Sequence, residues 1–267
     1  KYDVFRMTVE SQVAGKRQEQ ITDLTKIISL TTDEKERPKL LFRLGELFWE
    51  ESKYKFFQAN RKDDEYIKAM NKQDKAGMDQ AKKEKEAFTA ESKENAKLAV
   101  DQYSEIVQKY KDFPRNDEVL YFLGQNLMEM GDERRSLISY KRLIEKYPKS
   151  RYLPDAHLAF GEYYFNNSKG KRDFLDKALD AYTKAAAYPE NAVYGFAIYK
   201  QGWCYFNMAD YEKAMDRFKS VVLLEDLLGK EETEGGKGKG GTTARAGLIK
   251  EARTDFVRAY SRLPSGT

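Results

Sequence analysis

The stretch YPKSRYLPDAHLAFGEYYFNNSKGKRDFLDKALDAYTKAAAYP (147–189) decides the fold, because it begins and ends on the same Tyr-Pro pair. In its first half, Gly161 is followed three positions later by Tyr164. In its second half, Ala178 is followed four positions later by Tyr182. Offsets of three and four place residues on one face of an α-helix. The stretch therefore predicts two helices joined by a turn, and its matching ends indicate one copy of a repeated unit.

The pattern of the second half recurs along the chain. Each copy has a small residue, an aromatic residue four positions later, and an apolar residue three positions after that. The four copies are KLAVDQYSEIVQKY (97–110), RSLISYKRLIEKYP (135–148), DKALDAYTKAAAYP (176–189) and EKAMDRFKSVVLLE (212–225). This spacing keeps the marked positions on one helical face, with the small residue where a neighbouring helix must approach closely.

A glycine lies upstream of each copy, with an apolar residue three positions later. The pairs are Gly45/Phe48, Gly124/Leu127, Gly161/Tyr164 and Gly202/Tyr205. Glycine inside a helix costs roughly 1 kcal/mol relative to alanine, so four glycines at corresponding positions indicate a packing reason. We expect helix–helix contacts too close for a Cβ atom. Each unit is therefore predicted to be a helical hairpin, and stacked hairpins form a solenoid.

The order of glycine, aromatic, small residue, aromatic and closing proline (Pro148, Pro189) resembles the tetratricopeptide repeat. The resemblance covers about residues 33–228. It implies an all-α fold, a right-handed superhelical solenoid of helical hairpins, that binds other proteins and has no catalytic activity. The Tyr-Pro-x-Ser junction followed by Pro154 and Ala156 further resembles bacterial cell-envelope members of this family. These include barrel-assembly lipoproteins, Tol–Pal-associated proteins and gliding-motility proteins.

The first unit departs from the repeat, because Gly45 and Ala99 lie 54 positions apart whereas Gly124 and Ser136 lie twelve apart. The inserted residues are rich in helix formers. We therefore expect the first hairpin to be greatly extended, by about twenty residues or roughly 30 Å in each helix, with a turn near 71–77. A disordered charged loop is the alternative interpretation.

These patterns predict the organisation of the whole chain. The expected parts are an N-terminal helix or cap (1–32), unit 1 (33–114) with a helical arm (about 50–96), unit 2 (115–150), unit 3 (151–190), unit 4 (191–228), a flexible Gly-rich loop (229–246) and the first helix of an incomplete fifth unit (247–264). TTDE (31–34) predicts a capping box at the start of unit 1. In the fifth unit Val257 and Tyr260 take the places of the glycine and the aromatic residue, so a further helix is expected to cover them.

Composition excludes several classes of function. One cysteine and one histidine cannot form an internal disulfide or a Cys/His zinc site. The 48 basic and 44 acidic side chains nearly balance, which disfavours a nucleic-acid surface. We interpret His157 as a partly buried structural residue and Cys204 as an inert core thiol. No enzyme, cofactor or metal is expected, and no uncharged run is long enough to span a bilayer.

The family resemblance implies a concave partner-binding groove lined by the first helix of each hairpin. The positions carried over are Phe42, Glu46, Trp49, Tyr121, Gln125, Met128, Leu158, Glu162, Phe165, Asn166, Tyr199, Trp203, Phe206 and Asn207. Aromatic side chains and two glutamates favour a peptide or helix with apolar and basic anchors, and both asparagines can hydrogen-bond a peptide backbone. The alternative for each aromatic residue is packing against the neighbouring hairpin.

We therefore expect a protein–protein interaction scaffold of a bacterial envelope complex, such as a surface, gliding-motility or outer-membrane assembly machine. The alternative is a binder of cell-wall glycan or polyanion that uses the arm lysines and the groove aromatics. A periplasmic or outer-membrane-associated location is expected, with the cytoplasm as the alternative. Membrane association would be indirect, through residues preceding Lys1.

Overall fold

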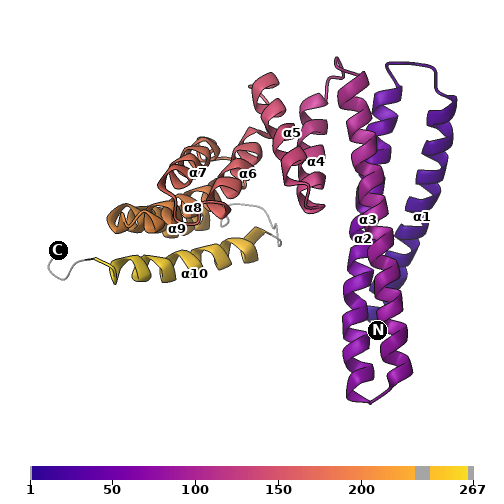
Figure 1. Cartoon of the computed structure of the whole chain (residues 1–267), viewed down its shortest axis with the longest axis horizontal. Helices are drawn as coiled ribbons and strands as arrows, with labels where there is room; N and C mark the ends of the chain where they lie inside the picture. Colours follow the sequence, from indigo (N-terminus) through magenta and orange to yellow (C-terminus); the bar gives the residue numbers. More distant parts are fainter. Residues whose placement is uncertain (1, 232–240, 264–267) are drawn as a thin grey trace. The chain divides into compact units, whose positions relative to one another are not determined.

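The computed structural model describes residues 2–231 and 241–263 (Figure 1). Every regular element within these ranges is an α-helix, as the fold class predicted from the repeat requires. The helices are α1 (Tyr2–Leu30), α2 (Arg37–Asn71), α3 (Lys75–Lys109), α4 (Asn116–Glu129), α5 (Glu133–Lys146), α6 (Leu153–Asn166), α7 (Arg172–Ala185), α8 (Tyr194–Asn207), α9 (Tyr211–Glu231) and α10 (Gly241–Tyr260). The chain forms two compact units, Lys1–Arg142 and Leu143–Thr267.

The repeated glycines allow the two helices of each hairpin to touch. At Gly161 the ring of Tyr182 occupies the space that a Cβ atom would need. A Cβ atom at Gly124 would lie 2.8 Å from Cε1 of Tyr140, and Ser136 donates a hydrogen bond to the Gly124 carbonyl oxygen at 2.7 Å. Tyr103 covers Gly45 and Phe218 covers Gly202 in the same way. The contact predicted from the sequence is confirmed in all four hairpins.

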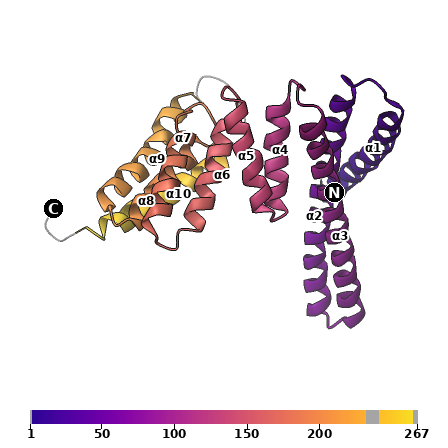
Figure 2. The same ribbon diagram turned by 45° about the horizontal axis from the view of Figure 1, so that its top comes forward.

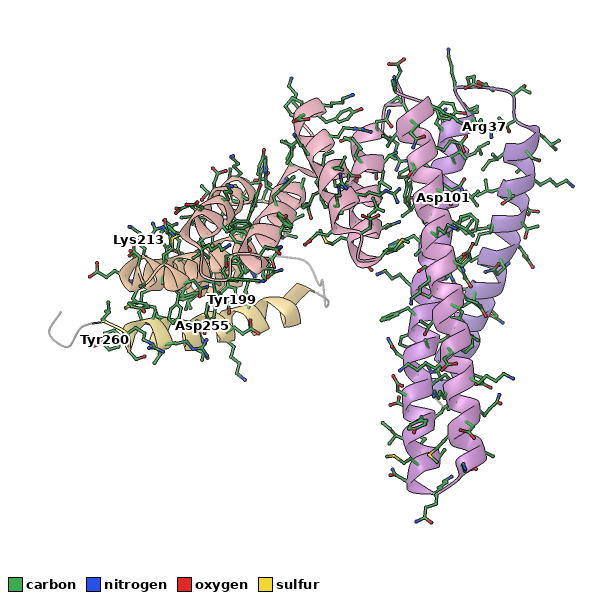
Figure 3. The ribbon with its side chains drawn as sticks, in the orientation of Figure 1. Arg37, Asp101, Tyr199, Lys213, Asp255 and Tyr260 are labelled. Carbon is green, nitrogen blue, oxygen red and sulfur yellow. The ribbon has the colours of Figure 1, made fainter. Side chains whose placement is uncertain are left out.

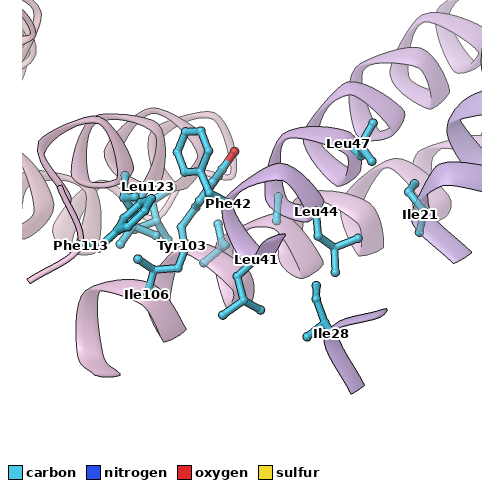
Figure 4. Packing of buried hydrophobic residues seen from close by; sticks show 14 residues of the cluster. Ile21, Ile28, Leu41, Phe42, Leu44, Leu47, Tyr103, Ile106, Phe113 and Leu123 are labelled. Atoms are coloured by element: carbon cyan, nitrogen blue, oxygen red, sulfur yellow. The ribbon is translucent and has the colours of Figure 1, made fainter. Parts of the chain in front are cut away.

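The first unit has its core where α1, α2, α3 and the start of α4 meet (Figure 4). Phe42 lies at the centre, with its ring centroid 5.7 Å from that of Tyr103 and 6.0 Å from that of Phe122. Ile21 and Ile28 bring α1 into the same cluster. The core therefore joins the N-terminal helix, the first hairpin and the next repeat.

The first hairpin is greatly extended, as the sequence indicates. Helices α2 and α3 have 35 residues each, whereas α4 has 14. Figures 1 and 2 show the α2–α3 arm continuing past the end of α4. The turn at its tip is closed by Asp74, whose Oδ1 accepts a hydrogen bond from the Gly77 backbone N–H at 3.0 Å. Inside the arm, Ser92 donates a hydrogen bond to the Ser52 carbonyl oxygen at 2.9 Å.

The start of α2 differs from the predicted capping box at 31–34. The helix begins at Arg37, and Glu36 at its N-cap forms no side-chain cap. Asp33 instead accepts a hydrogen bond from the Lys35 backbone N–H within the preceding turn. Pro38 in the first turn accounts for the later start. Proline is tolerated in the first turn of a helix, because the N–H group that it lacks would have no hydrogen-bond partner within the helix.

Helix α1 packs along α2, and a buried carboxylate joins them. The Glu51 side chain is only 1% exposed, and its Oε2 lies 2.7 Å from Nη1 of Arg17. Nζ of Lys55 lies 3.7 Å from the other carboxylate oxygen. A buried charge is tolerated only when it is paired in this way. Glu51 therefore sets the position of α1 along the arm.

In the second unit, α6 pairs with α7 and α8 with α9, and α10 packs against α8 and α9. Ala252 and Ala259 of α10 are fully buried in the cluster around Phe218, whereas Val257 and Tyr260 are exposed. Helix α9 reaches Glu231 and α10 begins at Gly241. Both ends of the Gly-rich loop expected at 229–246 are therefore helical, and its residues 232–240 lie outside the described part of the chain.

Replacement of Gly124 by alanine should destabilise the first unit. The new Cβ would overlap the Tyr140 ring, and overpacking of about 1–3 kcal/mol should exceed the gain in helix propensity of about 1 kcal/mol. We expect a net loss of up to about 2 kcal/mol in the free energy of unfolding, measured by urea denaturation. The matched control is Gly15→Ala, where nothing lies within 4 Å of the new Cβ, and stability should rise by about 0.5–1 kcal/mol. Equal effects of both substitutions would contradict the proposed contact.

Glu51→Gln should also destabilise the first unit, because Arg17 and Lys55 would keep their charges without the carboxylate. The expected loss is roughly 3 kcal/mol, typical of a broken buried ion pair. Neighbouring Glu50 is half-exposed, so Glu50→Gln should change the free energy of unfolding by less than about 0.5 kcal/mol. Circular dichroism during urea denaturation measures the free energy of unfolding of both variants. Similar small losses in the two would show that the Glu51 carboxylate is not required for the stability of the first unit.

Candidate protein-binding surface

Three helices of the second unit contribute to one surface, which we call the α6–α8–α10 face. It comprises Glu162 and Phe165 from α6, Lys200 and Trp203 from α8, and Arg258 from α10. Glu162, Phe165 and Trp203 are among the groove positions expected from the sequence, and the glycine contacts described above orient α6 and α8. Two sets of contacts cross between these helices: Lys200 with Glu162 and Phe165, and Arg258 with Trp203.

Lys200 joins α8 to α6. Its Nζ lies 3.0 Å from Oε1 of Glu162 and 4.5 Å from the centroid of the Phe165 ring. Glu162 also accepts a hydrogen bond of 2.6 Å from the Tyr182 hydroxyl. The Glu162 carboxylate therefore already has a cation and a hydroxyl as partners. A cation above an aromatic ring is attracted to the negative face of the ring, which further holds Lys200 in place.

Trp203 lies at the centre of the face. Its ring centroid is 5.3 Å from that of Phe206 and 6.1 Å from that of Phe218, in edge-to-face arrangements. The Arg258 guanidinium carbon lies 5.5 Å from the Trp203 ring centroid. Trp203 is therefore partly exposed but held on two sides by other rings and on a third by a cation.

A buried carboxylate positions Arg258. Asp255 accepts hydrogen bonds of 2.6 Å from Nη1 of Arg258 and 2.6 Å from the Tyr199 hydroxyl, and Figure 3 shows Tyr199 and Asp255 together. Burial, together with this hydrogen bond, raises the pKa of Tyr199 to about 12. The hydroxyl thus remains protonated at neutral pH and holds α10 against α8.

Two of the expected groove residues do not fit that role. Phe42 is 1% exposed and Tyr199 is 8% exposed, so neither offers a surface to a partner. The sequence pattern places both on the inward side of their helices. At these positions the neighbouring hairpin or α10 covers the ring, because apolar area is more stable in contact with protein than with water.

The other expected groove residues are divided between the two units. Glu46 pairs with Arg43 at 3.1 Å, and Nζ of Lys53 lies 4.4 Å from the Trp49 ring centroid. The partly exposed residues of α4 are Tyr121, Gln125 and Met128. Leu158 packs against the core around Tyr182. These positions remain predicted contacts.

The two asparagines expected to bind a peptide backbone are both exposed. Asn207 donates a hydrogen bond of 2.9 Å to the Trp203 carbonyl oxygen of its own helix. One of its two amide N–H groups is therefore used, whereas the other N–H group and the carbonyl oxygen can bond to a partner. For Asn166 the role stays a prediction.

Sequence reasoning missed Lys200, Arg258 and Asp255. Lys200 follows Tyr199 directly and lies three positions before Trp203, so its spacing offered a signal. Arg258 and Asp255 gave none, because their roles depend on α10 packing against α8 across a segment without a recognisable motif. A contact of this kind follows from the tertiary fold alone.

His157 and Cys204 have the surroundings of structural residues. Burial lowers the pKa of His157, and the nearby Lys184 lowers it further. Burial raises the pKa of the Cys204 thiol to about 12, which makes the thiol a poor nucleophile at neutral pH. Within residues 2–231 and 241–263, no group of histidine, cysteine and carboxylate side chains could hold a metal ion. None of the helices described there has the length and apolarity to cross a membrane.

Comparison with known proteins supports the repeat. Residues 118–150 and 196–224, which cover most of the α4–α5 and α8–α9 hairpins, match the family model described as Tetratricopeptide repeat. A solved structure titled "Crystal structure of MamA protein" is 22% identical, over 76% of this chain and 91% of that chain, with a TM-score of 0.41. No curated protein sequence gave a match.

The matched segments are two of the four hairpins in which an aromatic ring covers a glycine. These two hairpins of the chain therefore match the tetratricopeptide repeat. Its fold is of the kind that typically serves as a non-catalytic scaffold for protein interaction.

The lowered pKa of His157 predicts a pH-dependent contribution to stability. The folded state disfavours the protonated ring, so the unfolded state binds more protons between the two pKa values. The contribution is present above the unfolded pKa of about 6.5 and is lost as the pH falls toward the lower folded pKa. We expect that lowering the pH from 7.5 to 5.5 reduces the free energy of unfolding of the wild type more than that of His157→Gln.

His157 is the one histidine of the chain, so its imidazole signals in a proton NMR titration report this pKa directly. A folded-state pKa above 6.5 would contradict the proposed burial. The far-UV circular dichroism spectrum of the variant serves as the control for intact folding.

Proposed function

We propose that the protein is a non-catalytic scaffold of a bacterial envelope complex, and that it binds a partner protein on the α6–α8–α10 face. The observation that carries this proposal is the arrangement of Trp203. This ring is partly exposed, yet Phe206, Phe218 and Arg258 hold it in one orientation. A side chain that is already ordered loses little entropy on binding, and tryptophan is among the most frequent residues in binding hot spots.

The chemistry of this face favours apolar anchors on the partner. Phe165, Trp203 and Phe206 supply aromatic area. A lysine or arginine of the partner would have to displace Lys200 to reach Glu162, because these two side chains already form an ion pair. We therefore propose a peptide or helix that inserts apolar side chains between the rings, with any basic anchor as a secondary contact.

The proposed location is the periplasm or the outer membrane, with the cytoplasm as the alternative. Support comes from the sequence resemblance around Tyr147 and Pro154 to envelope members of the family, among them gliding-motility and outer-membrane assembly proteins. Fractionation of cells that express the tagged native gene tests this location. Recovery in the cytosol would exclude an envelope role.

A glycan or polyanion ligand is less well supported. Several arm lysines already neutralise acidic neighbours: Nζ of Lys62 lies 2.6 Å from Oε2 of Glu84, and Nζ of Lys85 lies 2.6 Å from Oδ1 of Asp63. Binding of a polyanion would have to break these pairs.

Trp203→Ala should weaken partner binding about thirtyfold, since truncation of an aromatic hot spot typically costs about 2 kcal/mol or more. Quantitative affinity purification from the native cells, followed by titration of the purified partner, measures the change. The matched control is Tyr163→Ala, a partly exposed aromatic residue of α6 outside this face, which should bind normally.

Thermal unfolding separates binding from folding. If Trp203→Ala retains the wild-type transition and the partner still binds equally well, the proposed surface is wrong. If the variant unfolds instead, Phe165→Ala provides the second test, because Phe165 lies on α6 and leaves the α8–α9 hairpin intact.

A further inference from the structure

Helix α4 packs mainly against α3, and its side chains also contact one face of α2, beginning in the core of the first unit. There the Phe42 and Phe122 rings lie 6.0 Å apart. At the far end of α4, Glu129 forms an ion pair with Lys53. Helix α4 ends at Glu129, whereas α2 continues to Asn71. About eighteen further residues of α2 therefore extend beyond the helix that packs against it, over roughly 27 Å.

Large apolar side chains recur on this face where α4 has ended, with Asn60 and Asp64 between them. Phe56, Phe57 and Ile67 follow Lys53 by three, four and fourteen positions, which keeps them on the same side of α2. Their exposed fractions are 57%, 44% and 49%. Large apolar side chains at helical spacing and with such exposure are typical of a surface that another helix covers. Helix α1 does not use this side, because it contacts α2 through Glu51.

A groove of 640 Å³ lies between α2 and α3 on the arm. Ala81 is the most deeply buried residue of its lining, and the Lys85–Asp63 ion pair crosses between the two helices. Lys82 and Lys93 of α3 also line it, and both are exposed. Among the described residues neither of these two lysines has an ion-pair partner. The exposed Glu86 also lines the groove, so the available positive charge along α3 is that of Lys82 and Lys93. The strip residues of α2 lie outside the lining of the groove.

We propose that the arm binds a second partner, an amphipathic helix with acidic residues along one flank. Its apolar side chains would pack on Phe56 and Ile67, and its carboxylates would face Lys82 and Lys93. The α4 helix shows the same chemistry on the adjoining part of α2, where an aromatic ring packs on Phe42 and Glu129 pairs with Lys53. The bound helix continues the α2–α4 interface along the arm.

Length and charge specify the occupant further. The strip from Phe56 to Ile67 spans about 17 Å, which corresponds to a helix of about three turns. Apolar anchors at i and i+11, about three turns apart, match the spacing of Phe56 and Ile67. Opposite charge along α3 fixes the direction in which the helix lies and increases the association rate.

Two synthetic helical peptides of eighteen residues test the proposal. Both carry leucine at the anchor positions, and their flanking residues are glutamate in one and lysine in the other. Fluorescence anisotropy with the whole chain should show preferential binding of the glutamate peptide. Ile67→Ser should weaken this binding about tenfold, and the Lys82→Glu/Lys93→Glu double variant should reverse the preference between the two peptides.

Matched controls lie on α1. Ile27 is 48% exposed, so Ile27→Ser removes a comparable apolar side chain and should leave binding unchanged. Lys26→Glu provides the same control for charge. Thermal unfolding of each variant should match the wild type, because the altered side chains are exposed.

Equal binding of the two peptides, or no effect of the three arm substitutions, would overturn the proposal. Loss of binding in Trp203→Ala with retention in Ile67→Ser would also overturn it, because the peptide would then occupy the α6–α8–α10 face. A higher salt concentration should weaken the glutamate peptide more than a leucine peptide with neutral flanks, and an equal response would count against the charge pairing.

Discussion

The ring of Tyr182 occupies the position in which a Cβ atom of residue 161 would lie, and three other aromatic–glycine pairs repeat this contact. The contact brings two helices together more closely than any other side chain at that position would permit. Packing of rings against backbone removes apolar area from water while the helices keep their internal hydrogen bonds. Each hairpin therefore has a defined geometry, and the surfaces that it presents to its neighbours follow from it.

The arm uses a different means of holding long helices together. It contains few large apolar residues, and its interior includes the Ser52–Ser92 hydrogen bond and the Glu51–Arg17 pair. Polar groups in such positions stabilise little in total, but an alternative alignment of the helices would leave them unpaired. We infer that these contacts specify register, whereas the core around Phe42 provides most of the stability of the first unit.

The two candidate surfaces differ in how their aromatic residues are held. On the α6–α8–α10 face, Trp203 is fixed by rings and by Arg258, which itself is positioned by the buried Asp255. On the arm, Phe56 and Ile67 project from a single helix and are largely exposed. The first surface is preorganised for a small number of deep anchors. The second resembles one half of a helix–helix interface, which only a partner helix completes.

The sequence by itself determined the repeat, the hairpins and the long arm. Those features depend on periodicity and on glycine at fixed positions, both of which are local properties of the chain. Sequence reasoning also selected Trp203 and Glu162 for the candidate surface. It could not show that Glu162 pairs with Lys200, or that Phe42 and Tyr199 are covered. Only the tertiary structure decided these points, because burial and ion pairing depend on which helix packs alongside, and residues far apart in the chain supply that helix.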